Sequence, residues 1–150
     1  MPTKQETFDK VLFHLRVQGK QSRGPSNGAC AYRGAGGVMC SAGVCIPDTV
    51  YRKEWEGTPL VQLTEPFPIA PAAGGPGPWL LRHGYSLPLL DQLQEVHDSW
   101  CDGNTGTLER QMRLVAQDFG LVYTPPGTIP ATLMASSASA VKPAAEEAVA

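Results

Sequence analysis

The stretch LPLLDQLQEVHDSWCDGNTGTLERQMRLVAQDFG, residues 87–120, carries the strongest helical pattern in the chain. In each half, large apolar residues recur four, three and four positions apart, a spacing that places them on one face of a helix. They are Leu89, Leu93, Val96 and Trp100, and then Leu108, Met112, Val115 and Phe119. The pattern predicts two helices, over 87–100 and 107–120, that pack as an antiparallel pair.

A third helix is predicted over residues 5–18. Its apolar face consists of Phe8, Val11, Leu12 and Leu15. All three predicted helices have residues at their ends that can satisfy free backbone groups or take a left-handed conformation. At the N-terminal ends these residues are Thr3 with Glu6, Ser86 and Thr107, and at the C-terminal ends Gly19 and Gly120.

A short β-hairpin is predicted in the segment that follows the first helix. Residues 29–33 and 38–40 flank the sequence GAGG (34–37), which favours a turn with positive φ angles. Two strands alone are marginally stable, so the hairpin is expected to pack on the helix over 5–18. The fold class is therefore predicted to be α+β and mostly α, with three main helices and a short hairpin.

The remaining segments are short or irregular. Residues 40–46 predict a short buried helix, and Asp48 is expected to cap a second helical piece that runs to Trp55. Residues 64–79 are rich in Pro and Gly and predict a flexible loop, and residues 124–150 predict a disordered tail rich in Ala, Ser and Pro. One small globular domain over 1–123 is the expected organisation.

Composition limits the class of protein. A chain of 150 residues normally forms one core, and its 16 glycines and 14 prolines favour a fold with many loops. The N-terminal segment lacks an apolar signal sequence, and no run approaches the roughly 20 apolar residues that span a bilayer. The expected compartment is the cytoplasm, where the four cysteines would be reduced. These are Cys30, Cys40, Cys45 and Cys101.

Charge is uneven along the chain, whose net charge is −2. Residues 1–33 contain six basic side chains against Glu6 and Asp9, and the remainder is acidic. We favour the interpretation that the two parts attract each other within the fold. The alternative is that the basic N-terminal third binds nucleic acid.

The cysteines and histidines of the chain raise two chemical possibilities, a zinc site and a nucleophilic cysteine. Cys30, Cys40, Cys45, His97 and Cys101 could supply a zinc site, but their spacing lacks the usual pair of ligands two to four residues apart. Cys40 or Cys45 could be a nucleophile with His97 or His83 as its base, but apolar neighbours raise a thiol pKa. Buried, unreactive cysteines are the favoured interpretation, and no metal or cofactor is predicted.

Other residues suggest a binding site. His97 and Asp98 form a dipeptide that is used by metal-dependent phosphohydrolases, although such sites need further ligands. The glycine turn lacks the residues of a phosphate loop, but its backbone amides with Arg33 could bind an anion. The candidate ligand-binding residues are Arg33, Gly34, Gly36, Gly37, Asp48, Tyr51, His97 and Asp98.

Several of these motifs together resemble a family of small uncharacterised proteins of tailed bacteriophages and prophages. The resemblance rests on CAYRGAGGVMCSAGVCIPDTVY (30–51) with Glu56 and Gly57, on LLDQLQEVHDSW (89–100) and on LERQMRLVAQDFGL (108–121). The family pattern places its second cysteine directly after the glycine, whereas here Val44 follows Gly43. The resemblance implies a phage origin and no particular activity.

These observations predict a phage accessory protein that binds a host protein or a small ligand in the bacterial cytoplasm, without catalysis and without a membrane segment. Two alternatives stay open. One is a small metal-dependent hydrolase or nuclease that uses His97 and Asp98. The other is nucleic-acid binding by the basic N-terminal third.

Overall fold

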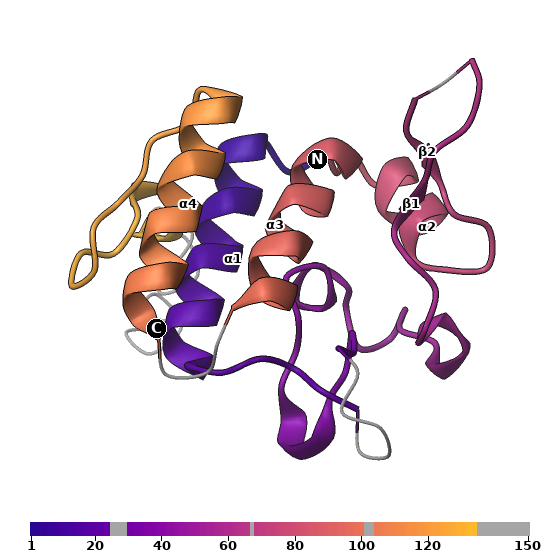
Figure 1. The fold of residues 1–150 in the computed structure, drawn as a ribbon, viewed down its shortest axis with the longest axis horizontal. Coiled ribbons are helices and arrows are strands. Elements are labelled where there is room, and N and C mark those ends of the chain that lie inside the picture. The colour runs from indigo at the N-terminus through magenta and orange to yellow at the C-terminus, as the bar shows by residue number, and fades with distance from the viewer. Residues whose placement is uncertain (25–29, 67, 101–103, 135–150) are drawn as a thin grey trace, which may run out of the picture.

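Three helices form the body of the molecule. The structure, a computed structural model, describes residues 1–24, 30–66, 68–100 and 104–134. The three main helices are α1 (Lys4–Gln18), α3 (Leu87–Ser99) and α4 (Thr105–Phe119). Figure 1 shows α1 between α3 and α4, and each of the three contacts the other two. Their apolar faces meet in one core, so the predicted mostly α fold with three main helices is confirmed.

The helix ends follow local capping chemistry. Thr3 and Glu6 form the predicted capping box on α1, with the Glu6 backbone N–H donating to Thr3 Oγ1 at 3.0 Å. Ser86 caps α3, as predicted. The N-cap of α4 is Asn104, so the prediction that Thr107 caps this helix was wrong. Asn104 Oδ1 accepts from the Thr107 backbone N–H at 3.1 Å, and a side-chain amide caps at least as well as a hydroxyl.

The two-stranded antiparallel sheet lies at a different place from the predicted hairpin. Strands β1 (Val61–Gln62) and β2 (Ala70–Pro71) pair with Val61 opposite Pro71. This pairing lies partly inside the predicted loop over 64–79. Each strand has only two residues, so proline at its end removes few ladder hydrogen bonds.

The segment that was predicted to form the hairpin is mostly turns. Among its described residues, an isolated bridge between Arg33 and Met39 is the only β-pairing of its two arms, around the 3-10 helix Ala35–Gly37. Gly36 and Gly37 have φ angles of 79° and 81°, as a tight glycine turn requires. Beyond this bridge the predicted strands were wrong for the described residues 30–33 and 38–40, because the N–H groups of Tyr32, Arg33 and Met39 donate to the side chains of Glu56 and Gln18.

Three further short helices follow in the chain. The predicted buried helix over 40–46 is present as the 3-10 helix Gly43–Cys45. The helix that was expected to begin at Asp48 begins only at Lys53, as the 3-10 helix Lys53–Trp55, because Pro47 O first accepts hydrogen bonds in a turn. The sequence did not indicate α2 (Gly77–Arg82), which begins within the predicted loop and lies beside the hairpin in Figure 1.

The end of the described chain packs on α1. Arg16 Nη2 donates to Thr124 O at 2.7 Å, and Thr132 Oγ1 donates to Asp9 Oδ2 at 2.5 Å. Residues 124–134 are thus ordered, in contrast to the disorder predicted from their composition, because they supply polar partners to α1. The rest of the predicted tail, 135–150, lies outside the described residues.

A substitution at Gly43 tests how closely the chain packs against the backbone of Tyr32. A Cβ atom at this position would lie 2.2 Å from Tyr32 O, so Gly43→Ala should lower the free energy of unfolding by at least about 2 kcal/mol in urea titrations. Gly106→Ala is the matched control, since a Cβ there meets only Asn104 Oδ1 at 3.6 Å and should cause no loss. Equal stability of the two variants would contradict the close approach at Gly43.

Candidate functional site

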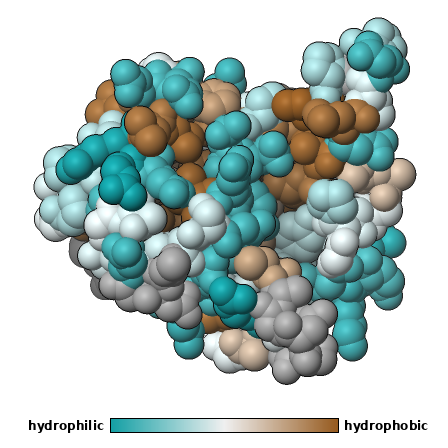
Figure 2. Space-filling view, in the orientation of Figure 1, coloured by the Kyte–Doolittle hydropathy of each residue, from teal (hydrophilic) through white to brown (hydrophobic). Residues whose placement is uncertain are grey.

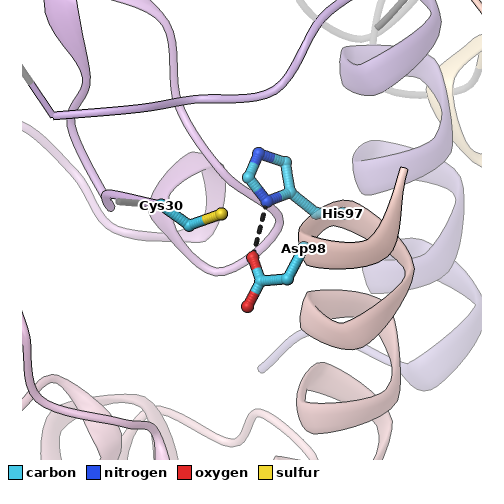
Figure 3. Close-up of side chains that lie close together, drawn as sticks. All are labelled: Cys30, His97 and Asp98. Atoms are coloured by element: carbon cyan, nitrogen blue, oxygen red, sulfur yellow. Dashed lines mark hydrogen bonds and ion pairs between the residues drawn. The ribbon is translucent and has the colours of Figure 1, made fainter. Parts of the chain in front are cut away.

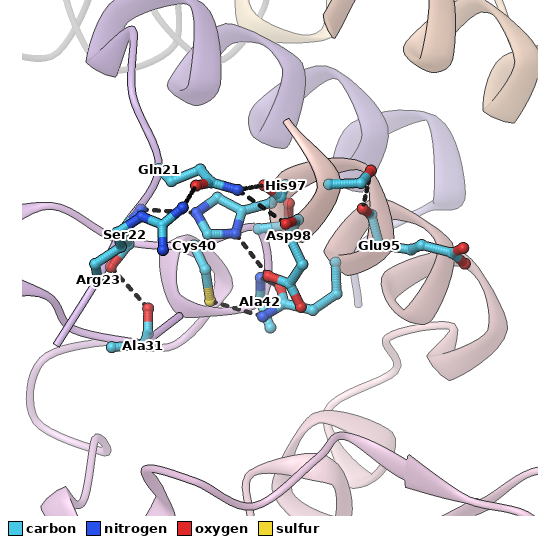
Figure 4. Close-up of polar contacts among 12 residues, drawn as sticks. Gln21, Ser22, Arg23, Ala31, Cys40, Ala42, Glu95, His97 and Asp98 are labelled. Carbon is cyan, nitrogen blue, oxygen red and sulfur yellow. Dashed lines mark hydrogen bonds and ion pairs between the residues drawn. The ribbon is translucent and has the colours of Figure 1, made fainter. Parts of the chain in front are cut away.

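The site centres on His97, a fully buried residue in the last turn of α3. Figure 4 shows Gln21 and Ser22, from the loop after α1, directed at the end of this helix. The Ser22 backbone N–H donates to His97 Nε2 at 2.8 Å. Gln21 Nε2 donates to the backbone oxygens of His97 and Asp98 at 2.8 and 2.9 Å. The loop therefore satisfies carbonyl groups that a helix end leaves without partners.

These contacts fix which nitrogen of His97 carries the proton. A backbone N–H can only donate, so Nε2, which faces the Ser22 N–H, must accept and be unprotonated. In the neutral ring the proton is then on Nδ1, which donates to Asp98 Oδ1 at 2.8 Å (Figure 3). The imidazole thus holds the Asp98 carboxylate in one orientation.

Cys30 completes a group of three side chains. Its Sγ atom, one nitrogen of His97 and one oxygen of Asp98 all lie within 4.8 Å of one another (Figure 3). If Nδ1 bound a metal through its lone pair, the proton of the neutral imidazole would have to be on Nε2. Two N–H groups, those of Nε2 and Ser22, would then point at each other. The same conflict arises if Nδ1 accepts the thiol proton of Cys30. The arrangement therefore fits neither a metal ligand set nor a cysteine with histidine as its base.

The thiols of Cys30, Cys40 and Cys45 all have raised pKa values, so few of them are ionised at neutral pH. Burial and then the charge of Asp98 raise the pKa of the Cys30 thiol. Burial raises the pKa of Cys40 to about 11 and that of Cys45 to about 12. The prediction of buried cysteines is confirmed for Cys40 and Cys45, the two that were considered as nucleophiles. Cys101, one of the five residues that were considered as possible zinc ligands, lies outside the described residues.

An acidic pocket of about 480 Å³ opens beside this group. Its lining includes Asp91, Glu95 and Asp98, which lie four and three positions apart on α3 and so share a face. The side chain of Asp98 is 46% exposed, so its carboxylate reaches the pocket while His97 remains behind it. Burial, and then the charge of Glu95, raise the pKa of Asp91. None of the described lining residues is basic.

The other predicted site residues form an internal contact instead. Arg33 donates from Nη1 to Gly43 O at 2.5 Å and from Nη2 to Ile46 O at 2.6 Å. Its Nη2 also pairs with Asp48 at 3.1 Å, and its guanidinium lies 5.1 Å from the centre of the Tyr51 ring. Arg33, Asp48 and Tyr51 thus come together, but the guanidinium holds the chain rather than facing an anion.

The predicted glycines do not join this contact or the acidic pocket. Gly34 lies against Ser22 and Val38, where an added Cβ would be 2.6 Å from Ser22 Oγ. Gly36 and Gly37 have nothing within 4 Å of such a Cβ and form the exposed turn. Of the eight predicted residues, Asp98 lines the acidic pocket and His97 holds it from behind, while Tyr51 lines a different pocket.

Sequence reasoning did not assign Asp91 or Glu95 to the site, and it considered Cys30 only as a possible zinc ligand. Asp91 and Glu95 could have been found, because with Asp98 they repeat at the same helical spacing that revealed the apolar face. Cys30 carried no such signal, since it reaches His97 only through the folding of a loop that is far away in the sequence.

Comparison with protein-family models, with curated proteins and with solved structures gives no match to this chain. The resemblance to a phage family therefore stays a prediction. Among the described residues, no helix combines the length and the apolar character that crossing a membrane requires.

Removing the imidazole should destabilise the protein. His97→Phe keeps the ring volume but leaves the buried Ser22 N–H without an acceptor, which should lower the free energy of unfolding by about 1–3 kcal/mol. His83→Phe is the control, because His83 is exposed and should change stability by no more than about 0.5 kcal/mol. The measurement is urea denaturation followed by circular dichroism, and a His97→Phe protein as stable as the control would contradict the contact with Ser22.

The cysteines should differ in reactivity with iodoacetamide at pH 8. Cys30 is half-buried and should be alkylated in the folded protein, whereas Cys40 and Cys45 should be protected until it unfolds. With a pKa of about 11, only about one Cys40 thiol in a thousand is ionised at pH 8. The experiment needs a Cys101→Ser background and peptide mass spectrometry. Rapid labelling of Cys40 or Cys45 in the native state would show that they are accessible.

Proposed function

We propose that this chain is a bacteriophage accessory protein that acts by binding, in the cytoplasm of the infected cell, and that its acidic pocket takes a positively charged group. The group would be an amine or a guanidinium, carried by a host protein or by a small molecule. The observation that carries the binding of a cation is the pocket itself, about 480 Å³ in volume and lined by three carboxylates with no basic residue among its described lining. The phage origin and the compartment rest on the sequence alone.

The electrostatics of the pocket favour a cation. Asp91, Glu95 and Asp98 face the same space, and their mutual repulsion is not relieved by a basic neighbour in the described lining. The raised pKa of Asp91 reflects both burial and the charge of Glu95. A guanidinium or ammonium group would stabilise the ionised carboxylates and replace the water that they lose.

The remaining lining suits the stem of such a group. Tyr32 and Leu60 are buried residues that contribute apolar surface to the pocket, against which a hydrocarbon chain can pack. Tyr32 is held in place because its hydroxyl donates to Thr58 O at 2.5 Å. A charged head with an aliphatic stem, as in arginine, lysine or a polyamine, therefore matches the pocket.

His97 prepares the site without taking part in chemistry. Its Nδ1–H orients Asp98 before a ligand arrives, which reduces the entropy that binding would otherwise cost. Both ring nitrogens are used in this arrangement, and this favours binding over the alternative of a hydrolase that needs His97 as a base or a metal ligand.

The nucleic-acid alternative is less well supported. Arg16 and Arg33, two of the six basic residues of the N-terminal third, form ion pairs with Glu109 and Asp48. Arg16 also donates to Thr124 O at 2.7 Å. These contacts fit the interpretation that the basic N-terminal part and the acidic remainder attract each other within the fold.

Titration with N-acetyl-arginine amide, followed by NMR of the backbone amides, tests the proposal. Saturable shifts should centre on α3, and the neutral citrulline analogue should bind at least about tenfold more weakly. Asp91→Asn and Asp98→Asn should each weaken binding by a similar factor. Glu54→Gln, an exposed acid outside the pocket, is the control. Affinity should fall as the pH is lowered, beginning above the range of an ordinary Asp because the pKa of Asp91 is raised.

Two results would contradict the proposal. One is the absence of saturable shifts at millimolar concentrations of the arginine probe and of spermidine. The other is equal affinity for the arginine and citrulline compounds, since this would show that charge does not determine binding.

A further inference from the structure

A second pocket, of about 600 Å³, lies between the segment 49–55 and α2. Its character is opposite to that of the acidic pocket. The lining contains Arg52 and Arg82, and none of the described lining residues is acidic. Three aromatic side chains, Tyr51, Trp55 and Trp79, complete its walls. The volume is in the range that small-molecule sites occupy in proteins, about 300–1,000 Å³.

The two arginines are available to a ligand. Neither the Arg52 guanidinium nor that of Arg82 has a hydrogen bond or an ion pair with any residue that the structure describes, and both residues are exposed. Arg16 and Arg33, in contrast, are tied to carboxylates and to backbone oxygens. Two guanidinium groups at one pocket repel each other until an anion lies between them. Their planar donor geometry suits phosphate or carboxylate oxygens.

The aromatic side chains are held rigidly around the same space. Trp55 is buried and meets Tyr51 edge to face, with ring centres 6.4 Å apart and planes at 90°. Tyr51 is fixed further because its hydroxyl donates to Glu56 Oε2 at 2.7 Å. Trp79 is half-buried and stacks on His83 with ring centres 4.0 Å apart. Rigid aromatic walls bind flat rings at a small cost in conformational entropy.

Apolar side chains are also exposed on α2, which lines part of this pocket, and on the hairpin that contacts α2. Figure 2 shows hydrophobic residues gathered over α2 and the hairpin. The exposed apolar side chains of these elements and of the loop between the two strands include Leu63, Ile69 and Leu81. An anion with a flat apolar body matches the aromatic lining of the pocket better than a small inorganic ion, which would use the arginines alone.

We propose that this pocket binds a nucleotide unit, with the base against the aromatic walls and the phosphate between Arg52 and Arg82. Stacking on aromatic side chains and charge-assisted hydrogen bonds to phosphate are the two interactions by which proteins hold such units. The site is separate from the acidic pocket, and its existence does not depend on the function proposed there.

Calorimetric titration with dTMP and AMP tests this assignment. Each nucleotide should bind saturably, and adenosine and inorganic phosphate should each bind at least about tenfold more weakly, because each lacks one half of the recognised unit. Arg52→Gln and Arg82→Gln should each weaken nucleotide binding at least about tenfold. Arg110→Gln is the matched control, since Arg110 is an exposed arginine on α4 outside the pocket, and it should leave the affinity unchanged. Asp98→Asn should also bind nucleotides normally.

The oligonucleotide (dT)8 distinguishes the two sources of such a unit. Tighter binding than dTMP, with a steep loss of affinity as salt rises, would mean that the unit belongs to a single strand. Equal or weaker binding would mean that it is a free nucleotide. Both results keep the assignment of the pocket.

Three results would overturn it. The first is no saturable binding of either nucleotide at millimolar concentration. The second is nucleotide binding that Arg52→Gln and Arg82→Gln leave unchanged. The third is binding of phosphate, or of a phosphoserine peptide, as tight as that of the nucleotides, because the aromatic walls would then contribute nothing. Neither guanidinium group has a partner among the described residues, so both variants should fold, and thermal melting checks this.

Discussion

The hydrogen bond from the Ser22 backbone N–H to His97 Nε2 is the interaction on which the site depends. It joins the loop after α1 to the last turn of α3, two segments that are far apart in the sequence. Because the donor is a backbone amide, it also sets the position of the proton on the imidazole. The proton on Nδ1 is donated in a hydrogen bond to Asp98, and this bond holds the carboxylate where it faces the acidic pocket. One buried contact thus determines both the packing at the end of α3 and the chemistry of the surface beside it.

Glu56 connects the walls of the two pockets. Its carboxylate accepts from the backbone N–H groups of Tyr32 and Arg33, at 2.9 and 3.0 Å, and from the hydroxyl of Tyr51. Tyr32 lines the acidic pocket and Tyr51 lines the pocket with two arginines. A segment with almost no regular structure therefore places two sites of opposite charge by side-chain contacts. These side-chain contacts explain why the strands that were predicted on either side of the glycine turn did not form.

The helices could be predicted because their signals are local. Apolar spacing, the Thr3 and Glu6 capping box and the glycines at the helix ends act over a few residues, and the structure has all of them. Part of the site had a local signal as well, since Asp91, Glu95 and Asp98 follow helical spacing. The burial of His97 and the approach of Cys30 could not be predicted. They depend on contacts between segments that are far apart in the sequence.

The protonation of His97 is the most direct test of this account. Two-bond ¹⁵N correlation spectra of the imidazole, with the His97→Phe protein used for assignment, would locate the proton at neutral pH with and without added Zn²⁺. The account predicts a proton on Nδ1 and a bare Nε2, both unchanged by zinc. A proton on Nε2, with a bare Nδ1 whose signal shifts when zinc is added, would contradict it and would favour a metal centre with Cys30 and Asp98.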